Sequence, residues 1–249
     1  MRLDALRPES IEGLKSPERA HVTTRHILLI FSMALNRALE WGLMSKNPCK
    51  GVRKPKPTRK MRALSEEEVG RLLGVVRPED EAFYRVAVTL GLRKGELLAL
   101  KWEDVDLKLR TLEVKASVDT HLKGERWGPT KTHERRTITF GKKIKASLAR
   151  CERNGTHLVF PCPNGKVRRA GTLDNQFRRY KEAAGLPESV RIQDLRHTAA
   201  TLALRAGTPI HVVSRMLGHA SPDITLRVYS HVLSGMGEEA ARMQDTYQF

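Results

Sequence analysis

A basic, proline-containing segment divides this sequence into two unequal parts. Residues 51–62 hold six Lys or Arg and two Pro among twelve positions, and such a composition stays extended and hydrated. We therefore expect residues 1–50 and residues 63–235 to fold separately, joined by a linker that can follow a polyanion. The candidate phosphate-backbone contacts in the linker are Arg53, Lys54, Lys56, Arg59, Lys60 and Arg62.

The charge balance agrees with a polyanionic partner. Lys and Arg number 45 against 28 Asp and Glu, which gives a formal net charge of +17, and nucleic acid is the usual partner for such an excess. No apolar run is long enough to span a bilayer, and no secretory signal pattern begins the chain. We expect double-stranded DNA as the partner, with no membrane and no small-molecule substrate.

Metal sites and disulfides are not expected. The three cysteines, Cys49, Cys151 and Cys162, form no CxxC pair, and this pattern favours reduced thiols in a cytoplasmic protein. The nine histidines show no metal-binding spacing such as HExxH. We therefore expect neither a metal nor a cofactor.

Helical patterns dominate both parts. Residues 22–44 have apolar positions at helical spacing and end before Asn47-Pro48. In the second part, Ser65 and Glu68 form a capping-box pattern, so helices are expected over 65–76 and 79–90, with Gly91 as a stop signal. A further helix is expected over 96–101.

A small antiparallel sheet should follow these helices. Residues 111–118 alternate apolar and polar side chains, as expected of one half-buried strand. A turn at Lys123-Gly124 and a strand over 135–140 would complete the sheet. From residue 141 the chain is expected to be mostly helical, apart from a loop around 161–171. The fold class is thus mainly α with a small antiparallel β-sheet, an α+β arrangement.

Several short motifs in the second part combine residues suited to phosphate chemistry. They are Gly-Leu-Arg-Lys-Gly-Glu at 91–96, Asp-Leu-Arg-His at 194–197, Leu-Gly-His at 217–219 and Tyr-Ser-His at 229–231. A guanidinium fork can bind two phosphate oxygens and stays charged, and a tyrosine hydroxyl can act as a nucleophile. Each motif alone is weak evidence, but the set is specific.

The set resembles the catalytic domain of tyrosine site-specific recombinases, the phage integrase family, and follows the family's order over residues 61–235. The resemblance implies that Arg93 and Arg196 clamp the scissile phosphate and that His219 donates a hydrogen bond to one of its oxygens. Tyr229 would be the nucleophile. Glu96 matches the family's acidic residue that orients active-site groups.

Two further catalytic positions follow from the same resemblance. Lys131 lies where the family places a general acid on a β-hairpin, although Lys123 and Arg135 are rival candidates and a simple phosphate contact is an alternative role. Gln193 occupies a position where most members have His. Glutamine can donate a hydrogen bond but cannot exchange protons near neutral pH, so weakened rather than abolished chemistry is expected, with a remnant that has lost activity as the alternative.

The two ends of the chain depart from the complete family pattern. Residues 1–50 resemble the end of the family's helical core-binding domain and are short for a complete version, so we interpret them as a partial, apparently truncated domain. Residues 236–249 form a C-terminal tail. The resemblance implies that the tail contacts a neighbouring protomer in a tetramer on DNA, and a frayed tail is the alternative.

The implied function is site-specific DNA recombination by cleavage and rejoining through a 3′-phosphotyrosyl intermediate, without metal or ATP. Neighbouring cations, from Arg93, Arg196 and Lys131, should favour the phenolate of Tyr229. His197 and His231 are interpreted as structural. Two alternatives stay open: a DNA-binding remnant or regulator without cleavage activity, and DNA relaxation of the type IB topoisomerase kind.

Overall fold

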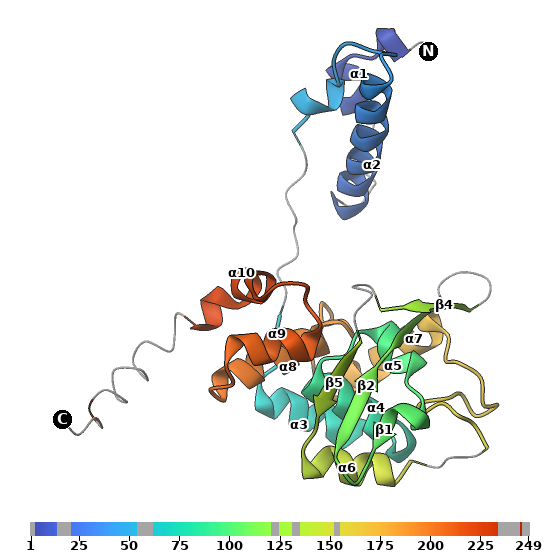
Figure 1. Cartoon of the computed structure of the whole chain (residues 1–249), viewed down its shortest axis with the longest axis vertical. Coiled ribbons are helices and arrows are strands. Elements are labelled where there is room, and N and C mark those ends of the chain that lie inside the picture. The colour runs from blue at the N-terminus through green and yellow to red at the C-terminus, as the bar shows by residue number, and fades with distance from the viewer. Residues whose placement is uncertain are drawn as a thin grey trace. The chain divides into compact units, whose positions relative to one another are not determined.

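The computed structural model of this chain describes residues 3–13, 21–53, 62–120, 125–130, 135–151, 155–233 and 245. The chain divides into two compact units, Met1–Lys60 and Met61–Phe249 (Figure 1). The boundary falls inside the basic segment 51–62. Four of its six predicted contact residues, Lys54, Lys56, Arg59 and Lys60, lie outside the described residues.

The first unit is a small helical assembly. It contains the short helices η1 (Leu3–Ala5), α1 (Pro8–Glu12) and η2 (Pro48–Gly51) and the longer α2 (His21–Glu40). Its core consists of Ile11, Leu28, Leu35, Cys49 and Val52. The side chain of Asn47 accepts a hydrogen bond from the Cys49 amide at 2.9 Å and donates to the Asn36 Oδ1 at 2.6 Å.

The helix expected over 22–44 is shorter than predicted. It ends at Glu40 because the backbone turns at Gly42, whose φ of 71° lies in the left-handed region. The apolar pattern continues through Leu43, but that side chain is exposed. Periodicity alone therefore placed the end of the helix too far along the chain.

The second unit begins with three helices close to their predicted positions. They are α3 (Glu66–Val75), α4 (Pro78–Leu90) and α5 (Lys94–Ala99). The capping box is confirmed, because the Ser65 hydroxyl accepts from the Glu68 amide at 3.2 Å while the Glu68 carboxylate accepts from the Ser65 amide at 3.0 Å. Gly91 ends α4 in the left-handed conformation, with φ of 65°.

The single strand predicted over 111–118 is wrong, since the chain forms two strands there. Strand β2 (Thr111–Val114) lies between β1 (Val105–Asp106) and β5 (Arg136–Thr139) in a three-stranded antiparallel sheet. Strand β3 (Ala116–Asp119) pairs instead with β4 (Arg126–Pro129). The alternation of buried residues continues through the break at Lys115, so the pattern could not reveal the change of partner.

The rest of the second unit is largely helical, as predicted. The elements are η3 (Trp102–Asp104), α6 (Lys142–Ala149), α7 (Ala170–Ala183), α8 (Asp194–Arg205), α9 (Ile210–Leu217) and α10 (Pro222–Leu233). The described residues between α6 and α7 form a longer irregular segment than the loop expected over 161–171. The fold class, mainly α with small antiparallel sheets, is confirmed.

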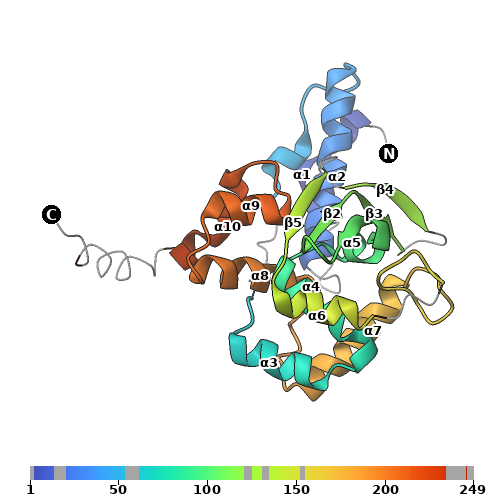
Figure 2. The ribbon, with the colours of Figure 1, turned by 60° about the horizontal axis from the view of Figure 1, so that its bottom comes forward.

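Two apolar clusters hold this unit together. The larger one joins α4, the sheet and α7, and its largest side chains include those of Phe83, Tyr84 and Leu112. The smaller one lies among α8, α9 and α10. Figure 2 shows these three helices grouped beside β5, and α9 contacts that strand. The ends of helices α4 and α9 therefore come close to the sheet edge, where the predicted site residues lie.

Candidate active site

The end of helix α4 fits tightly against α8 and α9. A Cβ atom at Gly91 would lie 2.7 Å from the Leu217 Cδ2 and 3.2 Å from the Ala199 Cβ. Gly91 also has a positive φ, which side-chain-bearing residues adopt at a cost. Glycine at this position therefore brings the last carbonyl groups of α4 to the first turn of α8.

Carbonyl groups at the ends of α4 and α9 anchor Arg196. Its Nη1 donates to the Gly91 carbonyl and its Nη2 to the Leu217 carbonyl, each at 2.7 Å. Both acceptors lie at helix C-termini, where the helix dipole favours a cation. Burial and the neighbouring Arg93 lower the pKa of Arg196 to about 10, so the guanidinium is still charged at neutral pH.

Arg93 is held by a carboxylate and by a second helix end. Its Nη1 donates to Glu96 Oε1 at 2.8 Å, and its Nη2 donates to the Gly218 carbonyl at 3.1 Å. An arginine fork offers more N–H donors than these two bonds use. Arg93 and Arg196 are thus both fixed by backbone carbonyls while retaining the capacity to bind a phosphate.

Glu96 is buried and bridges two arginines. Its carboxylate accepts from the Arg93 amide at 2.9 Å and from Arg136 Nη2 and Nη1 at 2.6 and 3.2 Å. Burial alone would raise its pKa, but the hydrogen bonds and charges of Arg136 and Arg93 outweigh burial and hold the pKa below the usual value. Glu96 thus contacts both Arg93 and Arg136, and the orienting role that the resemblance implied for it stays a prediction.

Arg136 is a site residue that the sequence interpretation missed. It is 8% exposed, donates from Nε to the Met216 carbonyl at 3.0 Å, and lies so near Gly218 that a Cβ there would be 2.8 Å from its Nη1. The alternation of β5 contained the signal, since Arg136 shares the inward phase with Ile138 and Phe140. A charged residue in a buried phase needs a partner, and Glu96 is that partner.

His219 lies just beyond the C-terminus of α9. Its Nδ1 is 2.7 Å from the Thr225 hydroxyl. Burial, with the positive charges of Arg196 and Arg93, lowers the pKa of His219 to about 4, so the ring is neutral at pH 7. When Thr225 donates to Nδ1, the proton of the neutral ring resides on Nε2, which can then donate to a phosphate oxygen.

Tyr229 packs into the cluster formed by α8, α9 and α10. It is 3% exposed, and its hydroxyl lies 2.8 Å from the Nδ1 of His197. Burial raises the pKa of Tyr229 to about 12, although the charge of Arg196 acts in the opposite direction. Arg196 therefore favours the phenolate, as expected of a neighbouring cation, but burial outweighs this effect and the net shift of the Tyr229 pKa is upward.

The remaining predicted site residues are not part of this described cluster. Gln193 precedes α8 with an exposed side chain. Within the described part of the chain, no hydrogen bond joins that side chain to Arg196 or Tyr229. Lys131 and its rival Lys123 lie outside the described residues, as does the side chain of His231, whereas Arg135 is described and exposed.

The two described Arg residues of the basic segment are both exposed. Arg53 is exposed, and the Arg62 side chain is 42% exposed while its Nη2 lies 2.7 Å from Glu68 Oε1. Of the predicted C-terminal tail 236–249, only Asp245 is among the described residues. The DNA contacts of the linker and the role of the tail therefore stay predictions.

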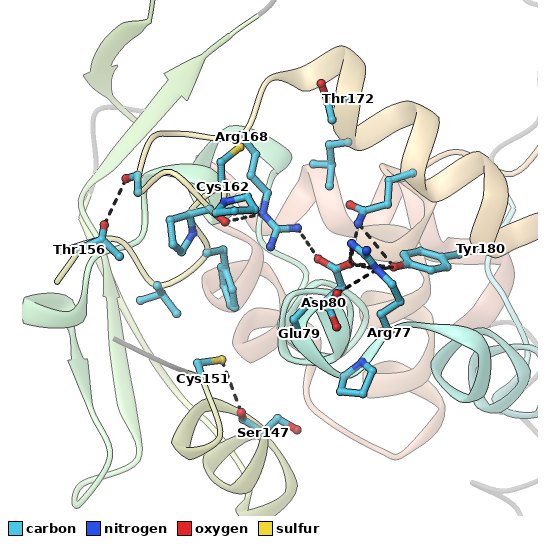
Figure 3. A pocket seen from close by; sticks show the side chains of 18 of the residues that line it. Arg77, Glu79, Asp80, Ser147, Cys151, Thr156, Cys162, Arg168, Thr172 and Tyr180 are labelled. Carbon is cyan, nitrogen blue, oxygen red and sulfur yellow. Dashed lines mark hydrogen bonds and ion pairs between the residues drawn. The ribbon is translucent and has the colours of Figure 1, made fainter. Parts of the chain in front are cut away.

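A separate cavity of about 1070 Å³ lies at the other end of α4. Figure 3 shows its walls, which come from the start of α4, α6, the segment before α7, and α7. At its edge Asp80 accepts hydrogen bonds from Tyr180 at 2.7 Å and from Arg77 at 3.0 Å, and it also pairs with Arg168 and Gln176. This polar cluster ties α4 to α7 and contains none of the predicted site residues.

Burial alone would raise the pKa of Asp80, but hydrogen bonds from Arg168 and Tyr180 hold it below the usual value.

Among the described residues, no group of three or more His, Cys, Asp or Glu side chains is arranged to hold a metal ion. The described helices also include none that is both long and apolar enough to cross a membrane. The described cysteines form no disulfide.

Comparison with known proteins agrees with this fold. The family model described as the phage integrase family matches residues 62–235, which contain both arginine motifs, His219 and Tyr229. The chain belongs to the phage integrase family.

Curated relatives are distant and longer. A XerC-like tyrosine recombinase of Caldanaerobacter subterraneus subsp. tengcongensis is 28% identical over 232 residues, covering 80% of this chain and 59% of the relative. The ICEBs1 integrase of Bacillus subtilis is 25% identical over 246 residues, covering 90% of this chain and 65% of the relative. The chain thus spans roughly three fifths of the length of these relatives.

Solved structures share the fold. The Tn1549 transposon integrase in complex with a circular intermediate DNA superposes with a TM-score of 0.81 at 19% identity, covering 91% of this chain and 82% of that one. A lambda integrase dimer bound to a COC′ core site gives a TM-score of 0.75 at 20% identity, with 92% and 81% covered. At these identities the likeness concerns the fold.

Proposed function

We propose that this chain carries out site-specific recombination of duplex DNA by cleaving and rejoining strands. Tyr229 attacks a phosphodiester, forms a 3′-phosphotyrosyl link and releases a 5′-hydroxyl. The observation that carries the proposal is the pair of arginines, Arg93 and Arg196, held by helix-end carbonyls in the same site as His219 and Tyr229. Membership of the phage integrase family supports it.

Each group has a role in charge stabilisation or proton transfer. The two arginines neutralise the phosphorane that forms when Tyr229 attacks, and such preorganised donors usually supply the largest catalytic effect. His219 donates from Nε2 to a non-bridging oxygen. Lys131 is proposed to protonate the 5′-oxygen as it leaves. The covalent link conserves the phosphodiester energy, so the scheme uses neither ATP nor a metal.

Double-stranded DNA and a second protein copy are the proposed partners. A related fold, that of lambda integrase, has been solved as a tetramer bound to a Holliday junction. We propose a tetramer on DNA in which residues 236–249 contact a neighbouring protomer and the basic segment 51–62 follows the phosphate backbone. Affinity should then fall steeply as salt rises. A cytoplasmic location is part of this proposal.

The test is a covalent trapping experiment. The protein is incubated with a pool of labelled duplexes that have randomised cores and a nick that traps the cleaved strand. We expect a DNA adduct on a denaturing gel, mapped by mass spectrometry to the peptide containing Tyr229 and absent in Tyr229→Phe. The control is Tyr84→Phe, which removes a buried hydroxyl that has no hydrogen-bond partner among the described residues.

The alternatives predict different results. Salt-sensitive DNA binding without an adduct would favour the remnant or regulator, and recovery of the adduct in Gln193→His would identify Gln193 as the cause of the loss. Relaxation of a supercoiled plasmid by the isolated protein, without recombinant products, would favour a topoisomerase. An adduct that persists in Tyr229→Phe would contradict the proposed nucleophile.

A further inference from the structure

The hydroxyl of Tyr229 has a hydrogen-bond partner that the proposed scheme does not use. The Nδ1 of His197 lies 2.8 Å from the Tyr229 hydroxyl oxygen, and the two rings are 6.0 Å apart between centroids. His197 is half-buried in the first turns of α8, directly after Arg196. One helix therefore presents a phosphate-binding cation and, beside it, an imidazole in contact with the nucleophile.

The nucleophile needs a proton acceptor. With a pKa of about 12, only about one Tyr229 side chain in 100,000 would be a phenolate at pH 7, and a protonated phenol attacks poorly. Arg93 and Arg196 are donors only. His219 has its Nδ1 bonded to Thr225.

Other groups in the site do not fill the role of acceptor. Gln193 is exposed, and an amide does not exchange protons near neutral pH. The carboxylate of Glu96 is bonded to Arg93 and Arg136. Among the described residues, His197 is the titratable side chain whose ring nitrogen lies at hydrogen-bonding distance from the reacting oxygen.

We propose that His197 is the general base of the cleavage step, an inference that rests on the proposed nucleophilic role of Tyr229. As the Tyr229 oxygen bonds to phosphorus, its O–H bond breaks and the proton passes to Nδ1 of His197. The bond between phosphorus and the 5′-oxygen breaks at the same centre, and that oxygen takes a proton from the general acid. In rejoining, the 5′-hydroxyl gives its proton back to the group that had protonated it and bonds to phosphorus, while the bond from phosphorus to the Tyr229 oxygen breaks and His197 returns its proton to that oxygen.

The proton transfer must accompany bond formation. An ordinary imidazole, with a pKa of about 6.5, is too weak to deprotonate a resting phenol of pKa about 12. Once the phenol oxygen shares electrons with phosphorus, its proton becomes acidic enough for an imidazole to accept. A positioned base of this kind contributes about 100- to 10,000-fold to a rate. Tyr229 therefore need not be a phenolate before it attacks, and its burial disfavours the phenolate.

The first test measures single-turnover adduct formation on the nicked-duplex pool. His197→Ala should slow cleavage about 100-fold or more, with thermal stability and DNA affinity close to those of the unaltered chain. His197→Asn places an amide near the position of Nδ1, so it can hold the phenol but cannot accept its proton, and it should be equally slow. His157→Ala, at an exposed position, is the matched control and should cleave normally.

The second test separates base from acid. Incorporating a fluorinated tyrosine of lower phenol pKa at position 229 should reduce the loss of cleavage rate caused by His197→Ala, because a more acidic phenol depends less on a base. A substrate with a bridging 5′-sulfur, whose thiolate leaves without a proton, should leave that defect unchanged.

Several results would overturn the inference while leaving the proposed function intact. They are an unaltered cleavage rate in His197→Ala, a normal rate in His197→Asn, and rescue by the 5′-sulfur substrate. The normal rate in His197→Asn would mean that His197 only holds the phenol. Absence of any Tyr229 adduct from the unaltered chain would instead remove the proposed function and this inference together.

Discussion

Replacing Glu96 by Gln should destabilise the second unit and impair cleavage. The two carboxylate oxygens each accept two hydrogen bonds: Oε1 from Arg93 and Arg136 side chains, and Oε2 from the Arg93 amide and the Arg136 side chain. Glutamine keeps the shape but has only one acceptor oxygen. In either orientation its NH₂ group would face two N–H donors, so two hydrogen bonds are lost.

The size of the effect follows from burial. The Glu96 side chain is 0% exposed, and that of Arg136 is 6% exposed. Hydrogen bonds to charged groups contribute about 1.5–3 kcal/mol each, and removing one partner of a buried ion pair costs about 3–5 kcal/mol. We expect the free energy of unfolding to fall by about 3–5 kcal/mol at pH 7. In one orientation of the amide Arg93 would lose its side-chain bond to Glu96, and in the other its backbone N–H would lose its acceptor, so the cleavage rate should fall at least about tenfold.

Denaturant unfolding of the full chain, followed by circular dichroism and tryptophan fluorescence, measures the change in stability. Glu103→Gln is the matched control, because Glu103 is 68% exposed and pairs with Lys101 at 3.3 Å; its loss should cost less than about 1 kcal/mol. If Glu96→Gln cost no more than this control, the bridging carboxylate would not be a major support of the site, and our reasoning would be refuted.

Two further changes test the packing and the second polar cluster. Gly91→Ala should destabilise the chain by about 2–4 kcal/mol, since it combines a left-handed backbone with a Cβ 2.7 Å from Leu217. The control is Gly74→Ala in α3, where no atom lies within 4 Å of the added Cβ, and it should stabilise the chain by about 0.5–1 kcal/mol. Equal changes of melting temperature in the two variants would contradict this account. Asp80→Asn should cost about 3 kcal/mol at neutral pH. Because the pKa of Asp80 is held below its usual value, its contribution is present above about pH 4 and is lost as pH falls further, so the difference from the unaltered chain should narrow in acid; a difference independent of pH in denaturant titrations would count against it.

Local signals in the sequence predicted the elements that depend on a few neighbouring residues. The capping box at Ser65 and Glu68 and the stop at Gly91 were both found in the structure because each acts within one helical turn. The exchange of partners at Lys115 was missed, since β2 pairs with β5, which follows in the sequence only after β3 and β4. The alternation of buried side chains along 111–118 is the same whether or not the partner strand changes.

The sequence named candidate site residues but not the network that joins them. The motifs and the family resemblance pointed to Arg93, Arg196, His219 and Tyr229, whereas Arg136 was overlooked beside the basic residues that precede it. Its burial follows from the phase of β5, which a sequence reading can recover. The contact between His197 and Tyr229 depends on the crossing of α8 and α10, and nothing local to either residue indicates it.

Each of the two arginines is held by a backbone carbonyl that belongs to a different motif. The carbonyl of Gly91, in the first motif, binds Arg196 of the second motif, 105 residues away. The carbonyl of Gly218, in the third motif, binds Arg93 of the first, 125 residues away. Both carbonyls belong to glycines that end helices in the left-handed conformation. Because each of these arginines depends on the helix end of another motif, a backbone change at either glycine should displace the arginine of a different motif.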